Sequence, residues 1–187
     1  MSEILSYLAV VLPADVSAGA RLLALQCALR MNAYMRVKLP TGMLRSLQID
    51  AVEACHELEQ ARWLSIVDGP GAAGVTTELR DATLLAQSPA RPDRRRAADW
   101  ALHSGSPART GTAEPLLRLQ AIYLKAHSDP SSRQGLTECD RIVRDCAMGD
   151  QLLHGALSRL TTAGILEGWR ICPDSEDLHW TLAPGQR

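Results

Sequence analysis

The sequence predicts a mainly helical α+β protein in which two halves follow the same order of elements. In each half, three stretches with the apolar spacing of helices precede two short runs of strand-forming residues. Between the halves, residues 87–113 are rich in Pro, Gly and Arg, a composition typical of a linker. We therefore expect a first domain over residues 1–86, a linker over 87–113 and a second domain over 114–187, because 187 residues suffice for two small domains.

The composition is that of an ordinary globular protein, with 46% hydrophobic and 22% charged residues and a net charge of −1. No apolar run reaches the roughly 18–20 residues that span a bilayer. The longest run, residues 4–12, lacks the basic start of a secretory signal and is expected to form a short leading strand. These features predict a cytoplasmic protein without a membrane partner.

Capping residues mark the predicted helices of the first half. Ser17 is expected to cap a helix over residues 18–33, and a short helix follows near Thr41–Leu47. Asp50, with Glu53 three residues later, forms a capping box for a third helix that runs to about Arg62. Two strands over residues 63–68 and 75–80, joined by the glycine-rich 69–74, complete the half.

The second half repeats this order. A helix over residues 115–127 begins with Pro at a tolerated first-turn position, and a second helix is expected over 137–147. Asp150 is expected to cap a third helix that runs to about Thr162. Strands over 165–172 and 178–182 follow, joined by the turn 173–177.

The end of the third helix is the most informative feature of the second half. Ala163-Gly164 stops the helical pattern and Ile165-Leu166 follows at once, so the chain must turn sharply into the next strand. Gly164 suits that corner because glycine tolerates a left-handed backbone. In the first half Arg62-Trp63 stands at the corresponding place, which makes that corner less typical.

The pattern Leu160-x-x-Ala163-Gly164-Ile165-Leu166, after a capped helix and before a hairpin, resembles the winged helix-turn-helix superfamily. Residues 39–67 look like a second, more divergent copy. The tandem arrangement resembles bacterial transcription regulators and plasmid replication initiators. It is also similar to the kleisin-binding subunits of bacterial condensins, which are acidic interaction proteins. The resemblance implies a fold of two winged-helix domains, but a fold alone does not determine a function.

The predicted third helix of the second half is the best candidate for reading DNA. Its inward stripe comprises Leu153, Ala156, Leu157 and Leu160. Its outward positions are Gln151, His154, Gly155, Ser158, Arg159 and Thr162. Arg159 is the strongest candidate, because arginine can hold a guanine or a phosphate with two donors. Arg170 is the candidate contact of the second hairpin. The alternative interpretation is an ordinary solvated helix face.

The third helix of the first half is different. Ala51, Ala54, Cys55 and Leu58 point inward, whereas Glu57 and Glu59 lie outside without an evident capping role. Carboxylates repel a phosphate backbone, so this face is more plausibly protein-facing or dimerising. Thr41 and Arg45 on the preceding helix could still contact a DNA backbone.

The predicted linker carries a net charge of +3, whereas residues 1–86 and 114–187 each carry −2. Arg94, Arg95 and Arg96, with Arg91 nearby, could follow phosphates or enter a minor groove. The alternative is a hydrated arginine cluster that keeps a linker soluble. A short helix over residues 97–103 is expected within it.

Metal sites and catalysis have little support in the sequence. The five cysteines are odd in number and form no close pair, which argues against a disulfide framework. Cys139 and Cys146, with His154, could suggest a metal site. Cys139, Ile142, Val143 and Cys146 have helical spacing, however, so both thiols are expected to face the core. We find no phosphate-binding glycine motif and no nucleophile elbow, and we expect neither an enzyme nor a cofactor.

These observations favour a DNA-binding transcription regulator that binds duplex DNA as a homodimer through its second domain and linker. The weak basicity of the chain, with a pI near 6.5, is the main difficulty for this hypothesis. The alternatives are a protein-interaction module that binds no DNA, or a protein resembling replication initiators. A third alternative is a regulator with a ligand pocket between its domains, about which the sequence says nothing.

Overall fold

The computed structural model describes residues 1–104 and 114–185 of the chain. It is a mixed α/β structure in which the described strands form two small antiparallel sheets of three strands each. Among the described residues, no helix combines the length and the hydropathy needed to cross a bilayer.

The first unit contains one of the sheets. Its strand order is β1-β3-β2, so the predicted hairpin gains a third strand at its edge. The elements of this unit are α2 (Ala18–Arg30), β1 (Arg36–Leu39), α3 (Thr41–Leu47), α4 (Ala51–Gln60), β2 (Leu64–Gly71) and β3 (Gly74–Leu79). Ser17 caps α2 and Asp50 caps α4, both as predicted, by accepting backbone N–H groups of the first turn.

The second unit has the same element order, and its sheet has the equivalent strand order β4-β6-β5. Its elements are α7 (Pro115–Ala126), β4 (Gln134–Glu138), α8 (Cys139–Asp145), a 3-10 turn (Asp150–Leu152), α9 (Leu153–Thr162), β5 (Leu166–Ile171) and β6 (Asp177–Leu182). Three helices complete the described chain outside the repeated order: α1 (Ser2–Val11), α5 (Thr83–Gln87) and α6 (Arg91–Ser104).

Matching backbone hydrogen bonds show that the two units follow the same path. The N–H of Leu79 donates to Met35 at 2.9 Å in the first unit, and that of Leu182 donates to Arg133 at 2.9 Å in the second. Met35 and Arg133 both have left-handed φ angles, 60° and 62°. Left-handed residues also follow the second helix of each unit, where Gln48 has φ 55° and Ala147 has φ 48°.

The corner after the third helix is also shared. Gly164 has φ 72°, as the sequence predicts, and Arg62 has φ 57° at the equivalent place. The N–H of Ile165 donates to Leu160 at 2.9 Å, and that of Trp63 donates to Leu58 at 3.1 Å. Both bonds are the long bond of a Schellman helix end. The first corner therefore has the same geometry as the second, although it is built with a side chain.

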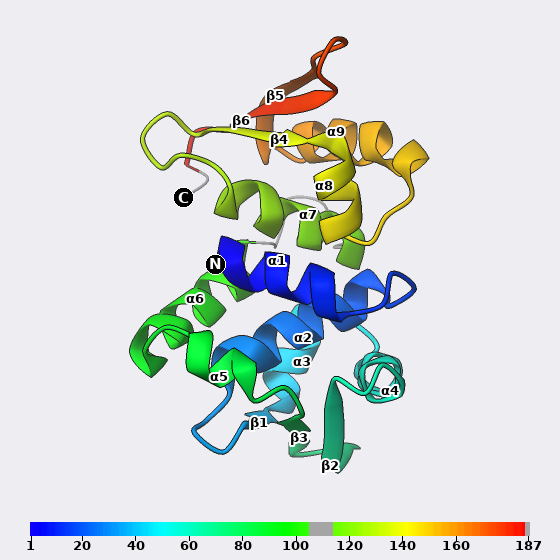
Figure 1. Cartoon of the computed structure of the whole chain (residues 1–187), viewed down its shortest axis with the longest axis vertical. Coiled ribbons are helices and arrows are strands. Elements are labelled where there is room, and N and C mark those ends of the chain that lie inside the picture. The colour runs from blue at the N-terminus through cyan, green and yellow to red at the C-terminus, as the bar shows by residue number, and fades with distance from the viewer. Residues whose placement is uncertain (105–113, 186–187) are drawn as a thin grey trace.

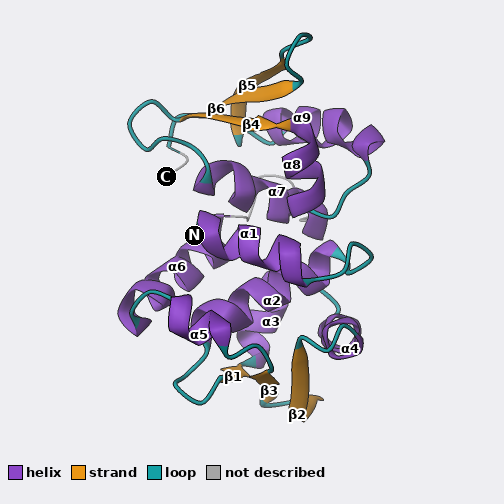
Figure 2. Ribbon diagram, viewed as in Figure 1, coloured by secondary structure: helices purple, strands orange, loops and turns teal. Residues whose placement is uncertain are grey.

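The helices fill the centre of the molecule and the two sheets lie at its opposite ends (Figures 1 and 2). The first helices of the two units, α2 and α7, pack against each other, and α1 lies across both units by contacting α2, α7 and α8. The buried apolar side chains of both units form one continuous core. The two units are therefore packed together rather than held only through the chain that joins them.

Two cations of α7, the buried Arg118 and the partly buried Lys125, hold this junction by donating to carbonyls at the ends of helices. Arg118 of α7, 2% exposed, donates at 2.5 Å to the carbonyls of Ser46 and Leu102, at the ends of α3 and α6. The ammonium of Lys125 donates at 2.9 Å to Ser104, the last residue of α6. Cations suit these positions because a helix C-terminus presents unpaired carbonyls and partial negative charge.

Several sequence predictions need correction. The expected strand over residues 4–12 is wrong: residues 4–11 belong to the helix α1 and Leu12 is its C-cap, because Ile4, Leu5 and Leu8 share one buried helical stripe. Residues 137–147 are divided between the end of β4 and α8. Asp150 does not cap α9, which begins at Leu153 after the 3-10 turn. Cys146 is buried as predicted, but Cys139 at the start of α8 is only partly buried.

The described part of the predicted linker, residues 87–104, is largely helical. The helix expected over residues 97–103 begins at Arg91, and this helix, α6, packs on α2 and α7. Residues 105–113 of the predicted linker lie outside the described residues.

Candidate nucleic-acid interface

The helix α9 presents the two faces that its spacing predicts. The inward stripe of Leu153, Ala156, Leu157 and Leu160 is buried. The predicted outward positions are all exposed: Gln151, His154, Gly155, Ser158, Arg159 and Thr162. Amide, imidazole and hydroxyl groups on this face can donate or accept hydrogen bonds at base edges or phosphates.

Arg159 is held by an ion pair with the residue that precedes the first helix of its unit. Its Nη1 lies 2.5 Å from Oε2 of Glu114, the N-cap residue of α7. Both side chains are roughly half exposed, 56% and 46%, so water or a phosphate can compete for the pair. Arg159 therefore has a structural partner as well as access to solvent.

In the first unit, too, a side chain of the third helix contacts the N-cap residue of the first helix, but here a carboxylate accepts hydrogen bonds. Counting from the shared helix end, Glu57 of α4 occupies the place of Arg159. The Glu57 carboxylate accepts from the backbone N–H and the hydroxyl of Ser17, at 2.7 and 2.8 Å, and Ser17 is the N-cap of α2. Glu59, also without an evident role in the sequence, accepts from the N–H of Ile66 at 3.2 Å. Both carboxylates thus have structural partners.

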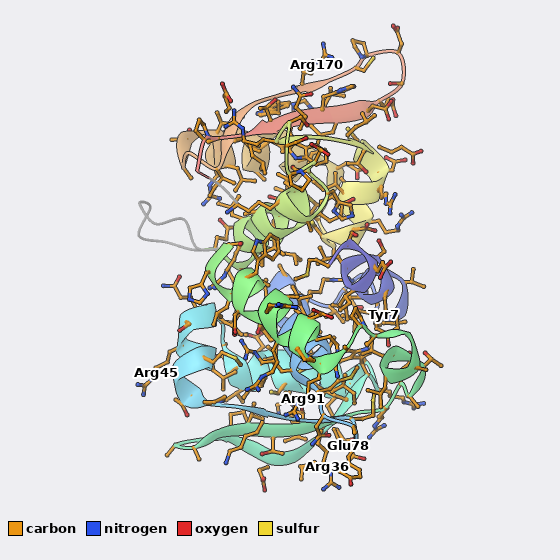
Figure 3. The ribbon with its side chains drawn as sticks, turned by 90° about the vertical axis from the view of Figure 1, so that its left-hand side faces the viewer. Tyr7, Arg36, Arg45, Glu78, Arg91 and Arg170 are labelled. Atoms are coloured by element: carbon orange, nitrogen blue, oxygen red, sulfur yellow. The ribbon has the colours of Figure 1, made fainter. Side chains whose placement is uncertain are left out.

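A candidate that the sequence predictions missed is Arg144 on α8. It occupies the place that Arg45 has on α3, three residues before the left-handed residue that follows each helix. The Arg144 side chain is 64% exposed, with Nε 3.4 Å from the carboxylate of Asp145. Arg45 is also exposed, and its side chain extends away from the body of the protein (Figure 3). Aligning the two halves residue by residue would have identified Arg144.

Arg170 lies on β5, beside His179 on β6, at the end of the molecule opposite Arg36 (Figure 3). It is exposed, as the sequence predicts. The hairpin turn beyond it carries exposed Asp174 and Glu176, whose charges would repel a phosphate. The body of the hairpin therefore suits an anion better than its tip does.

The predicted contact Thr41 is already engaged. Its hydroxyl donates to the carbonyls of Gly71 and Ala72, at 3.1 and 2.9 Å, and so ties α3 to the tip of the first hairpin. A threonine in this arrangement stabilises the hairpin, and its hydroxyl proton is not available to a DNA backbone.

The arginine cluster of α6 divides into buried and exposed members. Arg94 is 4% exposed and donates to the carbonyls of Met31 and Pro89, at 3.0 and 3.1 Å. The expectation that Arg94 follows phosphates is corrected, because its guanidinium closes the end of α2. Arg95 and Arg96 remain exposed, and Arg96 pairs with Asp93 one turn earlier.

Within residues 1–104 and 114–185, no group of three or more His, Cys, Asp or Glu side chains is arranged to hold a metal ion. Comparison with family models, with curated proteins and with solved structures gave no match. The function must therefore be inferred from the geometry of the chain itself.

Proposed function

We propose that the protein is a DNA-binding regulator composed of two winged-helix units, in which the second unit contacts DNA. The exposed polar face of α9 carries the proposal. It offers hydrogen-bond donors at His154 and Ser158, and no carboxylate lies among the outward side chains of α9 itself. The 3-10 turn before α9 adds the exposed amide of Gln151 next to the exposed carboxylate of Asp150. Arg144 on α8 and Arg170 on β5 would supply phosphate contacts. Such a regulator would act in the cytoplasm.

The first unit would have a supporting role. In place of Arg159 it carries Glu57, and the carboxylates of Glu57 and Glu59 hold α2 and β2. Its α4 is therefore poorly suited to a major groove. A homodimer, if it forms, would require a surface other than the α2–α7 junction, which is occupied within one chain.

The test is binding of the purified protein to random-sequence duplex DNA across a salt series, measured by fluorescence anisotropy. Replacing Arg144 by alanine should weaken binding and lower the salt slope by about one unit, because one phosphate contact is lost. Arg36→Ala is the matched control. Arg36 is 58% exposed, pairs with Glu78 and lies at the opposite end of the molecule (Figure 3). Equal losses for the two variants would argue against a specific interface.

The second candidate function is a protein-interaction module that binds no DNA. The observation that favours it is the exposed face of α4, where Val52 is 54% exposed beside the exposed Glu53. Absence of DNA binding even at low salt would eliminate the first proposal and leave this one. The first unit would then be the bait in the search for a partner.

A further inference from the structure

A pocket of about 550 Å³ lies between α6 and the second unit. Trp100 of α6 forms one wall, and Lys125 and Ala126 at the end of α7 form another. The loop between α7 and β4 and the side chain of Leu182 complete the lining. This volume falls within the range of pockets that bind small organic molecules.

Two cations and one carboxylate border the pocket. Lys125 has three N–H donors and gives one to Ser104 at 2.9 Å, which leaves two for a ligand. Arg133 donates to the carbonyl of Leu182 at 3.3 Å, and its Nη2 is 3.9 Å from Glu167. Burial lowers the pKa of Lys125, so water reaches this ammonium poorly and an anionic partner would stabilise its charge.

The carboxylate, Asp129, is occupied by its own loop. Its Oδ1 accepts the backbone N–H groups of Ser131 and Ser132, at 2.9 and 2.8 Å, and the hydroxyl of Ser131. These bonds lower the pKa of Asp129 to about 2. The lining residues carry two cations, Lys125 and Arg133, against this one carboxylate, so their net charge of +1 still favours an anion.

We propose that this pocket binds a small planar aromatic carboxylate. The carboxylate would accept from the Lys125 ammonium, with Arg133 adding positive potential. The aromatic ring would lie among the indole of Trp100, Ala126 and Leu182. Because Trp100 belongs to α6 and the other groups to the second unit, the ligand would contact both α6 and the second unit. The proposal concerns ligand binding alone and is independent of DNA binding.

The experiment is a titration of the full chain with benzoate, followed by tryptophan fluorescence and by thermal unfolding. We expect saturable binding with a dissociation constant on the order of 1 mM, as for a small fragment. Benzamide, which has the same ring without the charge, should bind at least about tenfold more weakly, because hydrogen bonds between charged groups are the stronger ones. Acetate, which lacks the ring, should also bind more weakly.

Two variants locate the site. Lys125→Met should remove the preference for benzoate over benzamide. Ala126→Leu fills the pocket while leaving both cations in place, so it should weaken both ligands even if Lys125→Met is poorly folded. Arg36→Ala, at an exposed arginine on β1 of the first unit, is the control and should bind as the wild type does. The proposal is overturned if benzoate does not saturate, if benzamide binds equally well, or if Ala126→Leu binds benzoate unchanged.

Discussion

Glu57 and Arg159 occupy the same position in the two units and contact the same place, the N-cap of the first helix. Glu57 accepts two hydrogen bonds from Ser17, and Arg159 pairs with Glu114. Both units thus have a polar contact between the third helix and the N-cap of the first helix. The residue of the third helix that makes this contact is negatively charged in the first unit and positively charged in the second. A charged residue on a helix that is predicted to contact DNA can therefore have an intramolecular, structural role.

The Glu57–Ser17 contact should stabilise the protein more than the Arg159–Glu114 contact does. Glu57→Ala removes the two carboxylate oxygens that accept from Ser17, the N-cap of α2. The loss should lower the free energy of unfolding by about 1 kcal/mol, similar to the loss of a helix cap. Arg159→Ala breaks a half-exposed pair and should cost no more than about 1 kcal/mol. Urea unfolding of both variants measures this. A larger loss for Arg159→Ala would show that its pair is more than a surface contact.

The corner residue Arg62 offers a stabilising substitution. Its φ of 57° is strained for a residue with a Cβ atom, so Arg62→Gly should raise the free energy of unfolding by about 1 kcal/mol. The reverse change at the equivalent corner, Gly164→Ala, should lower it by a similar amount. Chemical denaturation of the pair provides the comparison. If Arg62→Gly is neutral, the arginine side chain must make a compensating contact.

Arg118 should be essential to the junction between the units. Arg118→Met leaves the partly buried carbonyls of Ser46 and Leu102 without their donor and should destabilise the protein by about 2–3 kcal/mol. The matched control is Arg30→Met, because Arg30 of α2 pairs with the exposed Asp99 of α6 and does not contact the second unit in this pair. We expect differential scanning calorimetry to show a lower or divided transition for Arg118→Met only. A normal transition would mean that solvent reaches the carbonyls.

Tyr7 should make stability depend on alkaline pH. Burial and the 2.6 Å hydrogen bond to Asp81 raise the pKa of Tyr7 from 10.0 to about 12 (Figure 3). The folded state therefore keeps this proton where the unfolded chain releases it. Stability from this group is complete below pH 10 and is lost as the pH rises from about 10 to 12.

Unfolding as a function of pH measures the Tyr7 effect. Tyr7→Phe should flatten the decline of the free energy of unfolding between pH 10 and 12, since phenylalanine has no ionisable group at position 7. Tyr34→Phe, at a tyrosine that is 80% exposed, should leave the decline unchanged. If stability declines in Tyr7→Phe as it does in the wild type, the pH dependence comes from ionisable groups other than Tyr7.

The sequence was informative where a local rule was sufficient. The caps Ser17 and Asp50 satisfy the N–H groups of their own first turns, and the inward stripe of α9 follows from helical spacing alone. It was misleading in residues 4–12, where a short apolar run was interpreted as a strand although Ile4, Leu5 and Leu8 had helical spacing. The strands β1 and β4 were missed because their residues pair with segments distant in the chain.

The sequence by itself determined the repeated order of elements, the sharp corner at Gly164 and the polar outer face of α9, because each depends on residues close together in the chain. Only the tertiary structure decided that Arg94 and Arg118 are buried, that Thr41 binds the hairpin tip, and that the two units share one core. The sequence does not show whether an arginine side chain is solvated, pairs with a carboxylate or donates to the carbonyls at a helix end. Its partner is decided by distant carbonyls, and these come together only when the helices pack.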